Sequence, residues 1–257
     1  MEILIISLAA FITALLTFFS GFGLGTILTP VFIIFFPVDL AIALTGVVHF
    51  FNNLFKLFLV GKRADKAILI KFGIPAILAA FVGALIMINL SSVTPLFSYY
   101  VGAHLFKVTP LKFIIGILLI LFSLIDLIPY FKKLEFNQNK IPLGGALSGF
   151  FGGLSGHQGA LRSAFLINAG LSKEVFVGTS VVIATFIDFT RLSVYASRFG
   201  QSGLGQNLPL VISATFSAFA GAYLGNRLLD KITLSFIQKL VAILLLLISI
   251  SLTLGII

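Results

Sequence analysis

Apolar residues run through the chain in long stretches separated by short polar segments. A membrane-spanning helix needs about 20 consecutive apolar residues, and these stretches are of that length or longer. Two of them, 3–36 and 141–170, are too long for one ordinary helix, and a glycine-rich sequence interrupts each. Each is therefore predicted to be one bent helix or a hairpin of two short helices. The predicted segments are 3–36, 39–60, 68–90, 111–131, 141–170, 174–197, 207–229 and 235–256.

The composition excludes an ordinary soluble domain. Hydrophobic residues make up 59% of the chain and charged residues only 10%, whereas charged residues are about a quarter of a typical soluble domain. We therefore predict an all-α integral membrane protein that crosses the lipid bilayer of the cell membrane several times. The first segment has no basic region before it, so we expect it to belong to the mature protein and not to a signal peptide.

Charge and cysteine content exclude further classes. The net charge is +9, but most Lys and Arg residues fall between apolar runs, as in cytoplasmic loops, so no nucleic-acid binding is expected. The chain has no Cys, which excludes disulfides and thiol chemistry of the polypeptide. No carboxylate pair, zinc-ligand spacing or serine-histidine-acid order is apparent, so we expect neither an enzyme nor a bound cofactor or metal.

An internal repeat relates the two halves of the chain. It predicts a first membrane repeat at 1–131, a hydrophilic cytoplasmic linker at 132–140 and a second membrane repeat at 141–257, each of four segments. Both repeats begin with a glycine-broken segment. The matched positions are Thr45 with Ser180, Asn53 with Asp188, Lys56 with Arg191, 80–84 with 218–222, and 116–119 with 242–245.

Loop charges favour one of two topologies. If each broken segment crosses the membrane once, the halves run parallel and the loop Lys and Arg residues divide almost evenly between the two sides. If each is a hairpin, the second half is inverted and only Lys107, Lys112 and Arg198 lie outside. The positive-inside rule favours inversion, and inverted repeats with broken helices near the midplane recur in transporters.

The second break, from Gly152 to Arg162, predicts an anion site. Irregular backbone at membrane depth is tolerated only where it packs in protein or lines a cavity, and a short helix after Gly159 would point its positive end into that cavity. The alternative is that Gly145, Gly149 and Gly153 form a helix-packing face, with Arg162 paired to a carboxylate such as Asp188. The residues expected to contact a small anionic substrate here are Ser155, Gly156, His157, Gln158 and Arg162.

Polar residues on segment 39–60 lie on one helix face. Thr45, His49, Asn52, Asn53 and Lys56 share this face, which must point into the protein because the rest of the segment is apolar. Lys56 could instead extend to the cytoplasmic end, and the amides could only stabilise helix contacts. His49 is also a candidate proton relay.

Segment 174–197 carries a carboxylate. An aspartate at the bilayer centre costs about 2.5–3.5 kcal/mol on insertion scales, so Asp188 needs a partner, either Arg191 or Arg162. It is then a proton-coupling group or part of a static ion pair. We predict substrate contacts from His49, Asn52, Asn53, Thr26 and Thr179 besides the second break, and coupling roles for Asp188, Arg191 and Lys56.

These residues predict an anion transporter. An anion channel and a structural membrane protein that transports nothing are the alternatives, and a homo-oligomer is compatible with the sequence. Short polar clusters near the middle of the segments suit an occluded site better than a continuous wetted pore.

The repeated motifs resemble the TauE/SafE family of sulfite and organosulfonate exporters. The resemblance covers nearly the whole chain and implies a secondary transporter that exports small sulfur-containing anions, coupled to a proton or ion gradient. The chain departs from the family pattern where consecutive glycines are replaced by Gly156-His157-Gln158-Gly159, and Arg162 is a further difference. The positions that carry the resemblance are Gly21, Gly23, Gly25, Pro30, Gly153, Gly156, Gly159, Ser163, Gly178, Thr179 and Ser180.

Overall fold

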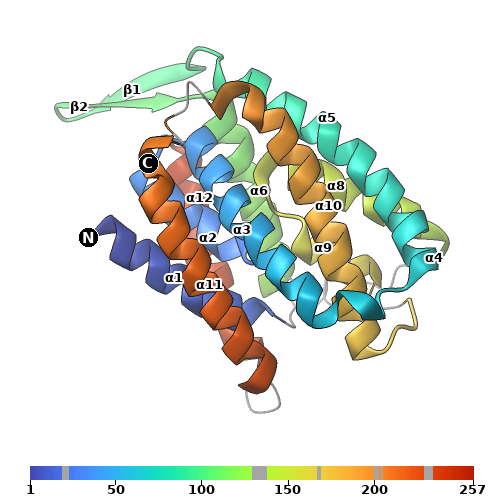
Figure 1. The fold of residues 1–257 in the computed structure, drawn as a ribbon. Coiled ribbons are helices and arrows are strands. Elements are labelled where there is room, and N and C mark those ends of the chain that lie inside the picture. Colours follow the sequence, from blue (N-terminus) through green and yellow to red (C-terminus); the bar gives the residue numbers. More distant parts are fainter. Residues whose placement is uncertain (19–22, 129–137, 167–168, 200–202, 204, 229–233) are drawn as a thin grey trace.

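The chain forms a bundle of helices with a short β-hairpin at one end (Figure 1). The computed structural model describes residues 1–18, 23–128, 138–166, 169–199, 203, 205–228 and 234–257. Helices occupy every segment predicted from the apolar pattern. They are α1 (Glu2–Thr17), α2 (Gly25–Phe35), α3 (Val38–Val60), α4 (Lys66–Ile68), α5 (Ile74–Ser91), α6 (Pro110–Leu127), α8 (Ile141–Ser155), α9 (Gly159–Leu166), α10 (Lys173–Phe199), α11 (Leu208–Leu228) and α12 (Leu234–Thr253).

Four helical stretches in the described part of the chain are long and apolar enough to cross a membrane. A π-helical turn, Leu69–Gly73, joins α4 to α5 in one of them. The surface of the bundle is apolar, with Phe58 86% and Phe216 66% exposed, whereas Asp188 and Arg191 are fully buried. This distribution is the reverse of a soluble protein and suits a molecule whose outer surface contacts lipid. The four stretches are Val38–Arg63, Lys66–Ser91, Lys173–Ser197 and Gly205–Arg227.

Both long segments are broken at a glycine with a left-handed backbone. Gly23 has φ +80° before α2, and Gly156 has φ +82° at the end of α8. The chain then folds back, because the Ser148 hydroxyl on α8 donates to the Gln158 carbonyl (2.9 Å) and Gly144 lies against the ring of Phe165 on α9. The second break is therefore a hairpin of two short helices.

The first break also turns the chain back. Gly23 lies beside His49 and Gly25 beside Thr45, in the middle of α3, while α2 ends next to the start of α3. Thus α2 runs opposite to α3. Figure 1 shows α3 and α11 running in the same direction by their colours, and α1 runs parallel to α11, since Ser7 bonds Ser213 and Phe11 contacts Gly221.

The two central helices, α3 and α10, cross in opposite directions. Gly46 contacts Leu192 near the end of α10, and Gly178 near its start contacts the Val60 carbonyl. The outer pairs are parallel: Gly145, Gly149 and Gly153 of α8 follow the backbone of α5 in register. Each pair joins a broken helix of one half of the chain to a long helix of the other half.

Glycines let these pairs approach to backbone contact. A Cβ on Gly149 would overlap the Ala76 carbonyl, and one on Gly153 would overlap that of Ala80. Gly221 of α11 sits in the same way against Phe11 of α1. Gly145, Gly149 and Gly153 thus form the helix-packing face considered from the sequence, and Gly221 gives α11 a similar close approach to α1.

One element contradicts a purely helical fold. Strands β1 (Phe97–Val101) and β2 (His104–Val108) form an antiparallel hairpin, with Tyr99 opposite Phe106. No element was predicted between the segments 68–90 and 111–131, where this hairpin lies. The Tyr99 hydroxyl donates to the Leu254 carbonyl (2.7 Å), which attaches the hairpin to the C-terminal turn.

Some predicted features lie outside the described residues. These are Gly21 and residues 132–137 of the linker; its remainder, Gln138–Lys140, is a 3₁₀ turn.

The packing predicts that Gly149→Leu destabilises the protein. The added side chain has no space against the α5 backbone, and overpacking of this kind costs about 1–3 kcal/mol or more. We expect a lower melting temperature in detergent. The matched control is Gly205→Ala, because no heavy atom lies within 4 Å of a Cβ built there. Equal melting temperatures for the two variants would contradict the close approach of α8 and α5.

Candidate functional site

A polar cluster occupies the crossing of α3 and α10. His49 and Asn53 come from α3, Asp188 and Arg191 from α10, and Gln158 from the second break, and all are buried. The helical spacing that put the α3 residues on one face brings them to the crossing, and the break lets Gln158 enter from a third direction. The interior orientation predicted for the α3 stripe is what the burial shows.

Asp188 is the hub of this cluster. Its Oδ2 lies 2.5 Å from His49 Nδ1 and accepts from Asn53 Nδ2 (2.9 Å). Its Oδ1 accepts from Gln158 Nε2 (3.1 Å) and Arg191 Nε (3.0 Å), and Arg191 Nη2 lies 2.9 Å away. Donors on three separate chain segments thus hold one carboxylate, which offsets the cost of burying its charge.

Arg162 joins the cluster through Gln158. Its Nη1 donates to Gln158 Oε1 (3.1 Å), while the amide nitrogen of Gln158 donates to Asp188. Asp188 therefore forms its direct ion pair with Arg191. Gln158 links Arg162 to Asp188 through one hydrogen bond to each. Of the two partners considered for Asp188, Arg191 is the nearer.

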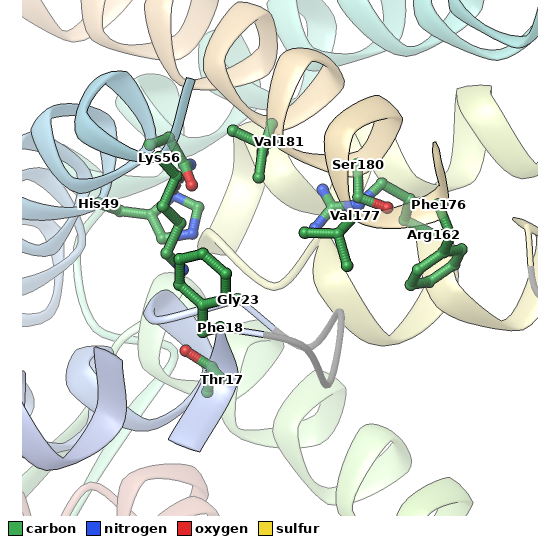
Figure 2. Close-up of a pocket in the computed structure, with 12 residues that line it drawn as sticks. Thr17, Phe18, Gly23, His49, Lys56, Arg162, Phe176, Val177, Ser180 and Val181 are labelled. Atoms are coloured by element: carbon green, nitrogen blue, oxygen red, sulfur yellow. Dashed lines mark hydrogen bonds between the residues drawn. The ribbon is translucent and has the colours of Figure 1, made fainter. Parts of the chain in front are cut away.

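A small cavity adjoins this cluster. Figure 2 shows Lys56 and His49 on one side of it, Arg162 and Ser180 on the other, and the end of α1 below. Lys56 is only 4% exposed and its ammonium lies 5.2 Å from the centre of the Phe18 ring. It stays inside the protein and does not extend to the helix end. Among the described residues, no carboxylate lines the cavity.

Buried basic side chains gather around the cavity. Lys56 and Arg162 line it, Arg191 belongs to the adjoining cluster, and all three are buried. Arg191 forms an ion pair with Asp188. Buried basic groups are stabilised by anionic partners, so the arrangement can hold a small anion.

The tips of the two broken segments meet at the same place. A Cβ on Gly25 would lie 3.1 Å from the Gly156 carbonyl oxygen, and one on Gly23 would lie 3.2 Å from His49 Nε2. Helices α2 and α9 both begin at these tips, so two positive helix ends converge on the cluster.

The remaining predicted site residues do not line this cavity. Ser155 and His157 are buried in the second break, where the His157 ring stacks on Phe122. Thr26 is buried in the first turn of α2, and Asn52 is fully buried with neither amide atom hydrogen-bonded in the described structure. Thr179 is not brought to the cavity: its hydroxyl accepts from the Asp65 backbone N–H (2.9 Å) at the turn after α3.

Sequence reasoning left two contributors out of the site. Ser180 lines the cavity, and its match with Thr45 was the signal that could have identified it. The Tyr195 hydroxyl donates to the Gly153 carbonyl and so holds α8 against α10 just before the break. No pattern in the sequence distinguishes Tyr195 from a residue that only packs.

Comparison with known proteins adds an independent result. The family described as "Sulfite exporter TauE/SafE" matches residues 6–252, and this match includes both broken segments and every residue of the cluster. No curated protein and no solved structure matches the chain. The resemblance seen in the glycine-rich motifs is confirmed, and the chain belongs to the sulfite exporter TauE/SafE family of membrane transporters.

Proposed function

We propose that the protein is a secondary transporter that binds a small sulfur oxyanion, such as sulfite or a short sulfonate, in the cavity between Lys56 and Arg162. The observation that carries this proposal is that two buried basic side chains, Lys56 and Arg162, line the same cavity. A sulfur oxyanion presents several acceptor oxygens on a compact anion, which matches a guanidinium fork facing an ammonium group. Ser180 adds a hydroxyl donor.

Export is the direction that the cavity supports. Lys56 and the first half of α10 line it, and they lie toward the end of the bundle that carries Lys62, Arg63 and Lys173. By the positive-inside rule this end is cytoplasmic. An anion would therefore enter this conformation from the cell interior.

Inverted repeats are the architecture that we propose for this mechanism. Three observations support it: α3 and α10 run in opposite directions, both broken segments turn back at a left-handed glycine, and Asn53 bonds Asp188. Asn53 and Asp188 occupy matched positions of the repeat. Matched residues contact each other where a two-fold axis passes between the repeats, and Asn53 and Asp188 are in contact. An axis across helices that span the membrane lies in the membrane plane, as in inverted-repeat transporters.

A proton is the coupling ion that we propose, carried by the His49–Asp188 pair. The pair lies at the centre of the cluster, and its charge changes when either group binds a proton. Protonation of Asp188 would weaken its hold on Arg191 and Gln158, so the proton and the anion would act on the same contacts. A static ion pair is the alternative.

A channel and a structural protein make different predictions. A channel would give anion flux that does not saturate and does not depend on a pH gradient, and a structural protein would give no flux. Proteoliposomes loaded with labelled sulfite or a short sulfonate, with and without a pH gradient, separate the three. Saturable flux that responds to the gradient supports the transporter.

The cavity predicts that Arg162→Ala and Lys56→Ala weaken anion binding. A hydrogen bond to a charged group contributes about 1.5–3 kcal/mol, so each variant should raise the half-saturating anion concentration by about ten- to a hundredfold. A thermal-shift titration with methanesulfonate and sulfite measures this. Lys62→Ala is the control, since Lys62 is exposed at the end of α3. Unchanged titrations in both cavity variants would contradict the site.

Asp188→Asn tests coupling. The amide keeps the size of the side chain and removes its charge, so flux should persist by exchange while its dependence on the pH gradient disappears. A variant that keeps the full pH dependence, or one that only loses thermal stability, would instead identify a static ion pair. Asp39→Asn at the start of α3 is the matched control and should transport like the unmodified protein.

Single cysteines test the inverted topology. The chain has no Cys, so a cysteine at Lys62, Lys173 or Lys107 reports alone to a membrane-impermeant thiol reagent. The inverted arrangement predicts that 62 and 173 react from the same side and 107 from the other. Reaction of 173 from the side opposite to 62 would require parallel halves.

A further inference from the structure

Two buried hydroxyl groups lie on the side of the cluster opposite to the cavity. Thr29 on α2 and Thr45 on α3 are fully buried, and their Oγ1 atoms have no hydrogen-bond partner in the described structure. A buried polar group left unsatisfied costs about 1–3 kcal/mol. Neither residue lines the cavity between Lys56 and Arg162, so the anion bound there does not account for them.

The repeat gives these hydroxyls counterparts. The match of the two positive-φ glycines, Gly23 and Gly156, extends to Thr29 and Arg162, because each lies six residues after its glycine. Three polar residues of the cavity thus correspond to residues on the other side of Asp188. The pairs are Lys56 with Arg191, Ser180 with Thr45, and Arg162 with Thr29.

Two glycines cover part of the Arg191 guanidinium from this other side. A Cβ on Gly46 would lie 3.3 Å from its guanidinium carbon, and one on Gly156 would lie 2.8 Å from Nη1. Gly46 precedes His49 on α3, so the covered face of Arg191 points toward the end of the bundle where α3 begins. Movement of the Gly156 tip away from α3 would uncover this part of the guanidinium.

We propose that Arg191, Thr45 and Thr29 form a second site for a small oxyanion, which opens to the outer side when the hairpin tips move apart. It is the inverted counterpart of the inner cavity and rests on the proposed transport function. In the conformation described here the Arg191 guanidinium is ion-paired with Asp188. An oxyanion that arrives from the inner cavity takes the place of this carboxylate, and the two hydroxyls donate to its remaining oxygens. When the oxyanion moves from the inner cavity to the second site, it replaces Asp188 as the anionic partner of Arg191.

Thr45→Cys and Ser180→Cys test the second site in the otherwise cysteine-free chain. Each variant is reconstituted and treated with a membrane-impermeant anionic methanethiosulfonate. Lys107→Cys and Lys62→Cys define the outer and inner sides independently. We expect Ser180→Cys to react from the inner side and Thr45→Cys from the outer side. Methanesulfonate, which does not cleave the disulfide formed, should slow both reactions at least several-fold.

Transport kinetics supply a second measurement. Thr45→Val should raise the half-saturating methanesulfonate concentration for flux started from the outer side by about tenfold, the effect of about 1.4 kcal/mol. Flux started from the inner side should keep its value, and Thr45→Ser should restore the outer one. If Thr45→Cys does not fold, Thr29→Cys takes its place in the labelling.

The outcomes separate this proposal from the function on which it rests. Reaction of Thr45→Cys from the inner side only, or from neither side, while the variant still transports methanesulfonate, overturns the outer site and leaves the transporter intact. Equal changes of outer and inner half-saturation in Thr45→Val also overturn it. Absence of anion flux in the unmodified protein overturns the proposed function itself.

Discussion

The buried carboxylate of Asp188 constrains the centre of the molecule. It accepts hydrogen bonds from His49 and Asn53 on α3, from Gln158 at the break between α8 and α9, and from Arg191 on its own helix. Each donor satisfies part of a charge that would be prohibitively costly alone in a low-dielectric interior. Because the donors come from separate segments, the carboxylate can be satisfied only when the crossing of the central helices and the second hairpin tip are both in place.

Close backbone packing makes that arrangement accessible. The glycines of α8 let it lie directly against α5, and those of α11 do the same against α1. Both broken helices are thereby fixed along the outside of the central pair, and their tips reach Asp188 from the inside of the bundle. Bulkier side chains would move the tips away and leave the carboxylate short of donors. Packing between apolar helices thus determines the electrostatics of a site several turns away.

The elements and many site residues follow from the sequence because two strong rules apply. Membrane helices need long apolar runs, and polar residues such as His49 or Asp188 must face inward within them. The partner of Asp188 did not follow, because both Arg191 and Arg162 were chemically suitable and only the path of the break decides which is nearer. Thr179 shows the same limit: it shares a helix with Ser180, but a helix turns by about 100° per residue, so the neighbours face different partners. The β-hairpin did not follow from the apolar runs, because its strands are too short to span a membrane; Gly102, at φ +62° in its turn, is the signal that could have identified it.

The distribution of charge explains why the centre suits an occluded site better than an open pore. The cations stand on both sides of one carboxylate, with Lys56 and Arg162 toward the cavity and Arg191 toward the covered side. Gly25 and Gly156 bring the backbones of the two tips into contact between the two sides. In the proposed site, an anion held by Lys56 and Arg162 would lie near the Asp188 carboxylate that is ion-paired with Arg191. Movement of the anion across the centre then requires both a shift of the tips and a new partner for Arg191. Both requirements are met by a two-state mechanism and neither is met by a static channel.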